Sequence, residues 1–81
     1  MRSGETIVEK NLYNEDVEIN EVVIYPQLNS QQTMYWKVEG LFGSYRFTLC
    51  LTTDKSEAEK RFAAVNDRLM EVHEADLRSR Y

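Results

Sequence analysis

The sequence predicts an α+β fold, in which a small antiparallel sheet of three to four strands is packed on one face by a long C-terminal helix (β-β-β-β-α). Three observations predict it. Apolar and polar residues alternate through much of the first two thirds of the chain, and near Thr52 the apolar period changes from two to about 3.6. The chain has only 81 residues, a length that allows one small core. We therefore expect a single domain over residues 1–81.

Two strands are expected in the N-terminal third. Residues 5–9 form a short one, and residues 16–25 form a longer one rich in β-branched side chains. The apolar residues of one parity in the longer segment are Val17, Ile19, Val23 and Tyr25. Pro26 lacks the N–H that continues a ladder, so the strand is expected to stop there and residues 26–32 to form a loop.

The middle of the chain predicts a β-hairpin with one buried face. The residues on that face are Met34, Trp36 and Val38 in one arm and Tyr45, Phe47, Leu49 and Leu51 in the other. Leu41 and Phe42 lie between Gly40 and Gly43, where we expect the tip of the hairpin. Large apolar residues at a tip either fold back onto their own sheet or anchor a partner, so Leu41 and Phe42 are candidate contact residues.

An amphipathic helix is expected over residues 55–78. Its apolar stripe consists of Ala58, Phe62, Val65, Leu69 and Val72. Asp54 with Glu57 forms one capping box at its start, and Ser56 with Glu59 forms a competing one. Such a helix is about 36 Å long and overhangs a small sheet. Met70, His73 and Leu77, on the flank of the stripe, then either line the edge of the core or contact a second copy.

Charge and cysteine content restrict the environment. Ten basic residues against fourteen acidic ones leave a net charge of −4, which opposes direct binding to nucleic acid or to an anionic membrane. The single cysteine, Cys50, forms no internal disulfide, which indicates a reducing compartment. The sequence has neither the apolar core of a signal peptide nor an apolar run long enough to cross a bilayer. We expect a cytoplasmic protein.

Catalytic and metal-binding patterns are missing from the sequence. His73 is the only histidine, and neither it nor Cys50 lies in a context that positions a nucleophile. There is no Cys/His spacing of a zinc site, and the segment from Gly40 to Gly43 lacks the Lys-Ser/Thr and the following helix of a phosphate-binding loop. We expect neither enzymatic activity nor a cofactor.

The acidic segment over residues 5–21 has two interpretations. It is either a solvated face that keeps a small protein soluble, or a surface complementary to a basic groove, where carboxylates imitate phosphates. Its candidate contact residues are Glu9, Glu15, Asp16, Glu18 and Glu21. We expect a non-enzymatic inhibitor that occupies the basic surface of a nucleic-acid-binding protein. Small size, acidity and the lack of enzyme motifs are also typical of phage-encoded inhibitors, including anti-CRISPR proteins. The alternative is a structural or dimerising subunit.

A less favoured interpretation comes from the order of the elements. The hairpin followed by residues 55–65 loosely resembles the last part of a double-stranded RNA-binding domain, and also three-stranded DNA-binding modules that end in one helix. The resemblance covers about half the chain and implies a lysine cluster at the helix start that grips phosphates. Here the cations Lys55, Lys60 and Arg61 are interleaved with acids, and an acidic strand region stands where the family has an N-terminal helix. Nucleic-acid binding therefore ranks last.

Overall fold

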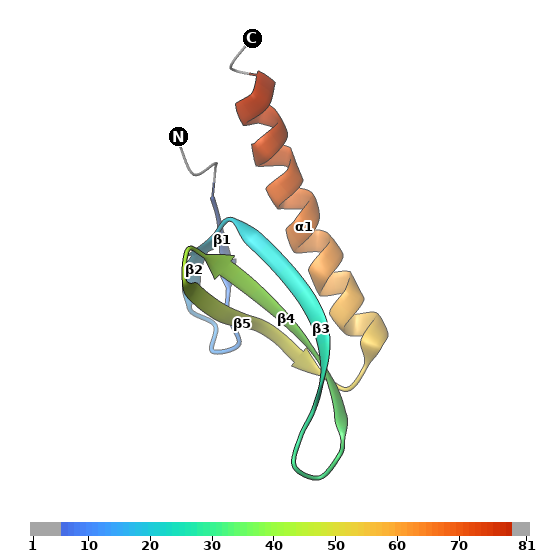
Figure 1. The fold of residues 1–81 in the computed structure, drawn as a ribbon. Coiled ribbons are helices and arrows are strands. Elements are labelled where there is room, and N and C mark those ends of the chain that lie inside the picture. The colour runs from blue at the N-terminus through green and yellow to red at the C-terminus, as the bar shows by residue number, and fades with distance from the viewer. Residues whose placement is uncertain (1–5, 79–81) are drawn as a thin grey trace.

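Over residues 6–78, which the computed structural model describes (side chains for 6–74), the chain forms two antiparallel sheets and one helix (Figure 1). The elements are β1 (Ile7–Lys10), β2 (Asp16–Ile19), β3 (Glu21–Leu28), β4 (Met34–Phe42), β5 (Tyr45–Thr52) and α1 (Lys55–Arg78). β1 and β2 pair as a two-stranded ribbon, and the other strands form a sheet in the order β3-β4-β5. The predicted α+β class, a small antiparallel sheet followed by a long C-terminal helix, is confirmed.

The core lies between α1, one face of the three-stranded sheet and the inner side of the β1–β2 ribbon. Its buried apolar residues are Ile7, Ile19, Val22, Val38, Leu49, Ala58, Val65 and Leu69. The helix supplies the last three at the spacing that the sequence predicted, with Phe62 and Val72 half-buried beside them. Asp54 caps the helix, since its Oδ1 accepts the backbone N–H groups of Ser56 and Glu57 at 3.0 and 3.4 Å. The last turns of α1 extend past the sheet, as Figure 1 shows.

The long strand expected over residues 16–25 is in fact two strands in different sheets. Asn20 separates β2 from β3, and its N–H donates to the carbonyl of Leu41 at 2.9 Å. After the break, the residues on the buried face differ from those expected. Val22 and Ile24 face α1, whereas Val23 pairs with Glu39 on the opposite face of the sheet. β3 also continues through Pro26, which pairs with Trp36, to Leu28. β3 is an edge strand, and that is where a sheet tolerates proline.

A β-bulge in β5 overturns the expected orientation of its last residues. The register shifts at Val38 and Glu39, so that Val38 pairs with Cys50 and Glu39 with Thr48. Cys50 therefore packs against the core. Leu51 pairs with Lys37 on the outer face, the face opposite α1, and is 43% exposed instead of buried.

Two glycines of the β4–β5 hairpin, one in the turn and one within β4, lie where another residue would be strained or crowded. The turn consists of Gly43 and Ser44, and Gly43 has φ 61°, a conformation that L side chains rarely adopt. At Gly40 an added Cβ would lie 2.7 Å from Cγ2 of Ile19, so a side chain here would require Ile19 to shift. Leu41 and Phe42 are consequently half-buried strand residues and do not form the tip of the hairpin.

Candidate protein-binding surfaces

Exposed carboxylates gather on the β1–β2 ribbon and at the start of β3. We call the group formed by Glu15, Asp16, Glu18 and Glu21 the acidic ribbon. Asp16 and Glu18 are alternate residues of β2 and share the side of the ribbon that faces away from the core. Glu18 accepts a hydrogen bond from Thr6 at 2.6 Å, and Asp16 pairs with Lys10 at 2.7 Å. Glu15, Glu18 and Glu21 make no ion pair within the described residues.

Glu9 stands apart from the acidic ribbon although the sequence groups it there. It alternates with the outward residues of β1, so its side chain points beneath α1 and is only 6% exposed. Its carboxylate pairs with Arg61 at 3.1 Å and with Arg68, both on α1. Arg61 also donates to the carbonyl of Lys10 at 3.1 Å. Glu9 therefore joins the ribbon to the helix and is not available to a partner.

A second buried carboxylate, Glu39, lies on the outer face of the sheet. Its Oε1 accepts a hydrogen bond from Arg46 at 2.8 Å, and its Oε2 lies 3.5 Å from Nζ of Lys37. Burial by itself raises the pKa of Glu39, but hydrogen bonds from Arg46 and Tyr25 and the charges of Arg46 and Lys37 outweigh it. The net result is a pKa below the ordinary value.

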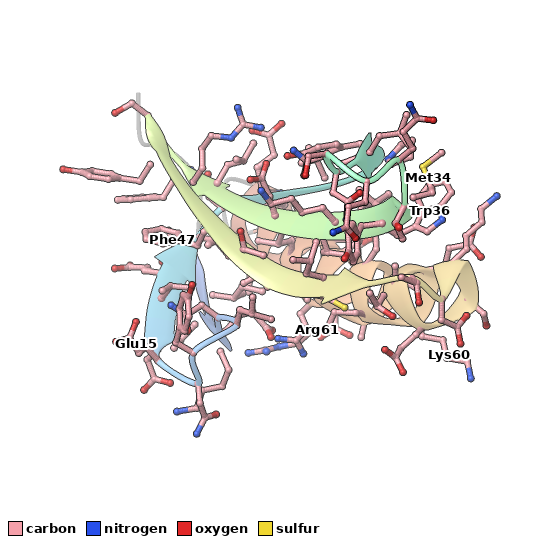
Figure 2. The ribbon with its side chains drawn as sticks, turned by 90° about the horizontal axis from the view of Figure 1, so that it is seen from below. Glu15, Met34, Trp36, Phe47, Lys60 and Arg61 are labelled. Carbon is pink, nitrogen blue, oxygen red and sulfur yellow. The ribbon has the colours of Figure 1, made fainter. Side chains whose placement is uncertain are left out.

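These two buried glutamates determine where several cations of the chain lie. Together they engage four cations: Arg61 and Arg68 on Glu9, Lys37 and Arg46 on Glu39. Lys55 lies over the ring of Trp36, 5.1 Å from its centroid. Figure 2 shows Arg61 directed toward the ribbon and Lys60 directed away from it. Exposed carboxylates with no ion pair in the described part of the chain are Glu15, Glu18, Glu21, Asp54, Glu57, Glu59, Asp67 and Glu71. Among the described residues, none of the four cations at Glu9 and Glu39 forms an ion pair with a carboxylate of the acidic ribbon.

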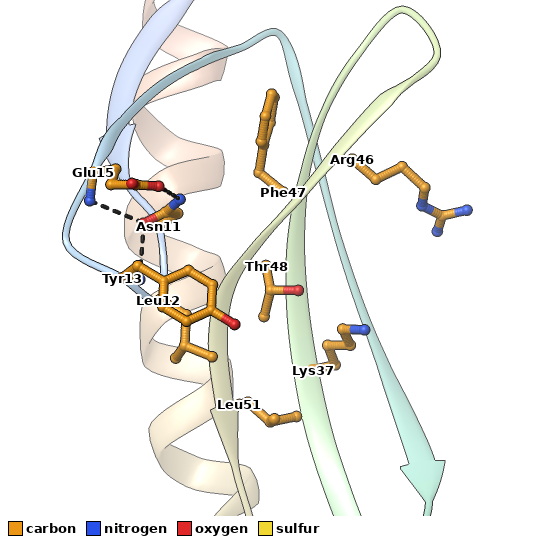
Figure 3. A pocket seen from close by; sticks show the side chains of 9 residues that line it. All are labelled: Asn11, Leu12, Tyr13, Glu15, Lys37, Arg46, Phe47, Thr48 and Leu51. Atoms are coloured by element: carbon orange, nitrogen blue, oxygen red, sulfur yellow. Dashed lines mark hydrogen bonds between the residues drawn. The ribbon is translucent and has the colours of Figure 1, made fainter.

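A groove of about 420 Å³ lies beside the acidic ribbon, between the β1–β2 turn and β5 (Figure 3). The turn is built by Asn11, whose Oδ1 accepts the N–H groups of Tyr13 and Glu15 at 2.8 and 2.9 Å. Asn14 closes it with φ 62°, and the N–H of Leu12 donates to the carbonyl of Thr48 at 2.8 Å. The sequence by itself does not predict this groove. Asn-Leu-Tyr-Asn is a turn signal, but pairing of the turn with a strand 36 positions later is not readable from it.

The expected dimer contact on α1 is only partly described. Met70 is 58% exposed and accepts a hydrogen bond on its sulfur from Asn66 at 3.5 Å, and His73 is exposed. The side chain of Leu77 lies outside the described residues. Within the described residues, the flank offers one large exposed apolar side chain, that of Met70.

A different apolar surface occurs where the β3–β4 hairpin projects past the start of α1. Leu28 pairs with Met34 and Pro26 with Trp36, on the same face as the core residues Ile24 and Val38. Leu28 is 59% exposed, and Met34 is exposed as well. Figure 2 shows Met34 and Trp36 together at this end of the molecule, away from Glu15. We call Pro26, Leu28, Met34 and Trp36 the hairpin patch.

Two chemical features of the described residues concern metal binding and the single cysteine. Residues 6–74 contain no group of three or more His, Cys, Asp or Glu side chains that could hold a metal ion. Burial raises the pKa of the Cys50 thiol, with a further rise from the charge of Glu57 and an opposing effect of Arg61. Across the described stretch, the one long helix is too polar to span a bilayer.

Comparison of the chain with protein-family models, characterised proteins and solved structures finds no match.

Proposed function

We propose that the protein is a non-enzymatic protein-binding module, whose acidic ribbon occupies a basic, nucleic-acid-binding surface of a partner protein. Glu15, Asp16 and Glu18 would contact lysine and arginine side chains where phosphates otherwise bind, so the protein would act as an inhibitor. Phage-encoded antagonists of nucleic-acid-directed defence, such as anti-CRISPR proteins, are the class that this mechanism suggests.

One observation carries the proposal: the burial of Glu9 and Glu39 with two cations each. Those cations are held at Glu9 and Glu39, and within residues 6–74 none of them forms an ion pair with Glu15, Glu18 or Glu21. Opposing charges on a partner would then be attracted over a distance comparable to the Debye length, about 10 Å at 0.1 M salt. The cations at the start of α1 are also largely engaged, since Lys55 covers Trp36 and Arg61 holds Glu9. This argues against the phosphate grip that the RNA-binding resemblance implies.

The experiment is affinity capture from a bacterial lysate with the wild type and two charge-reversed variants. One variant is Glu15→Lys with Glu18→Lys on the ribbon. Its matched control is Asp67→Lys with Glu71→Lys, which makes the same change in net charge at exposed positions of α1.

We expect a stoichiometric partner that is retained by the wild type and the control, lost with the ribbon variant, and released by double-stranded nucleic acid or by 0.5 M salt. Equal loss of the partner in both variants would indicate that binding depends on net charge and not on a defined surface. A ribbon variant that still captures the partner would refute the proposal. Tighter binding of nucleic acid itself by the ribbon variant than by the wild type would favour the nucleic-acid-binding alternative.

The hairpin patch favours a second candidate function, a dimerising subunit. Residues 26–36 contain no charged side chain in a chain that is 30% charged, so two acidic copies can approach there with the least repulsion. Light scattering with size exclusion tests this. Leu28→Glu should convert a dimer to a monomer, whereas Met70→Glu on the helix flank should leave it intact. A dimer that is disrupted only by Met70→Glu would place the dimer contact on α1. A monomeric wild type would exclude a dimer contact at either surface.

A further inference from the structure

The groove beside β5 combines two kinds of wall. On one side are the apolar and aromatic side chains of Leu12 and Tyr13, and Phe47 and Leu51 extend this lining along β5. The cations Lys37 and Arg46 also line the groove, across β5 from the turn, and Figure 3 shows the Arg46 side chain extending away from Leu12 and Tyr13. A volume of about 420 Å³ lies within the range of small-molecule sites, about 300–1,000 Å³.

The apolar wall is held in place before any ligand arrives. Two hydrogen bonds to the side chain of Asn11 set the turn, and the Leu12 N–H bond to Thr48 ties it to β5. Tyr13 is 78% exposed, so its ring presents a free face. A flat apolar group could pack on this wall without rearrangement of the backbone.

The opposite wall carries an uncompensated positive charge. Lys37 and Arg46 share a single carboxylate, that of Glu39. The Arg46 side chain is 61% exposed. It uses one nitrogen, Nη2, to donate a hydrogen bond to Glu39, so its other N–H groups remain available as donors. Glu15 also lines the groove, but it accepts a hydrogen bond from Asn11 and lies at the turn side, away from Lys37 (Figure 3).

We propose that this groove binds an amphipathic anion, a carboxylate attached to a flat aromatic or apolar body. The body would pack on Leu12 and Tyr13, and the carboxylate would accept hydrogen bonds from Lys37 and from free N–H groups of Arg46, whose exposed side chain would turn toward it. Such a carboxylate could belong to a free aromatic acid or to the C-terminus of a peptide that ends in an aromatic residue. The proposal is independent of the acidic ribbon and of any basic partner.

The test is an NMR titration of the ¹⁵N-labelled protein with 2-naphthoate and with the neutral isostere 2-naphthamide. We expect naphthoate to shift the amide resonances of Leu12, Tyr13, Thr48 and Leu51, and naphthamide to bind at least about tenfold more weakly. Acetyl-Gly-Phe and its C-terminal amide provide the peptide arm. Shifts by naphthoate identify free aromatic acids as ligands, and shifts by the peptide acid alone identify a chain terminus.

Variants separate the two walls of the groove. Tyr13→Ala and Arg46→Gln should each weaken naphthoate binding, and Lys60→Gln, which removes an exposed cation elsewhere on α1, should not. Because Tyr13 is so exposed, its variant should fold even if loss of Arg46 disturbs Glu39. Equal affinity for naphthoate and naphthamide, shifts that map outside the groove, or equal behaviour of Arg46→Gln and Lys60→Gln would overturn the proposal.

Discussion

Glu9 makes the contact whose removal most directly tests how the ribbon is held to the helix. It is the one carboxylate that joins β1 to α1 through two arginines, Arg61 and Arg68. Glu9→Gln keeps the size and one acceptor oxygen of the side chain but removes its charge. Both arginines then lose a charge-assisted partner.

The expected cost follows from burial of the three groups. A hydrogen bond to a charged group contributes about 1.5–3 kcal/mol, and loss of one partner from a buried ion pair costs about 3–5 kcal/mol. Here only the carboxylate is buried: the Arg61 side chain is 33% exposed and that of Arg68 is 53% exposed, so both can regain water. We therefore expect Glu9→Gln to lower the free energy of unfolding by about 2 kcal/mol. For a domain of this size Tm should fall by about 10 °C.

Urea and thermal unfolding, followed by circular dichroism, measure this change. The matched control is Glu21→Gln, the same chemical substitution at an exposed position without an ion pair, for which we expect a change within about 0.5 kcal/mol. A double-mutant cycle with Arg68→Gln should give a coupling of about 1 kcal/mol or more. Equal stability of Glu9→Gln and Glu21→Gln, or a coupling of zero, would refute the reasoning.

Two further predictions concern Glu39 and Gly40. The pKa of Glu39 is lower in the folded protein than its ordinary value of 4.5, so its stabilising effect is complete above that value and is lost as pH falls through the folded-state pKa. The difference in urea midpoint between wild type and Glu39→Gln should therefore shrink between pH 7 and pH 3; parallel curves would contradict this. Gly40→Ala places a Cβ against Ile19 and should cost about 1–3 kcal/mol. Ile19→Ala should cost less in the Gly40→Ala background than in the wild type, and strict additivity in a double-mutant cycle would show that the close contact is not the cause.

Local sequence patterns predicted the elements whose signals lie within a few residues of one another. The helix over residues 55–78 and its cap at Asp54 are as expected, because helical periodicity and capping depend on neighbours three to four positions apart. The alternation that buries Val38 and leaves Lys37 on the outer face was likewise readable in β4. Of the candidate surfaces, the exposed acids at Glu15 and Glu18 could be located from sequence, as could the exposed flank at Met70.

Tertiary structure decided which face each residue occupies where the local pattern was ambiguous. The bulge in β5 arises from pairing with β4, and it exchanges the environments of Cys50 and Leu51 without any change in the alternation of the sequence. The split at Asn20 sends one apolar run into two sheets.

The sequence by itself therefore determined the α+β class, the helix and the excess of acid over base. Only the tertiary structure determined which charges remain at the surface. Glu9 pairs with Arg68, which is 59 positions away in the sequence. Glu18, an acid of the same type on the same ribbon, stays exposed. Whether a carboxylate is neutralised depends on which face of a strand meets the helix. That depends on strand pairing over long sequence separations, which a local pattern does not encode.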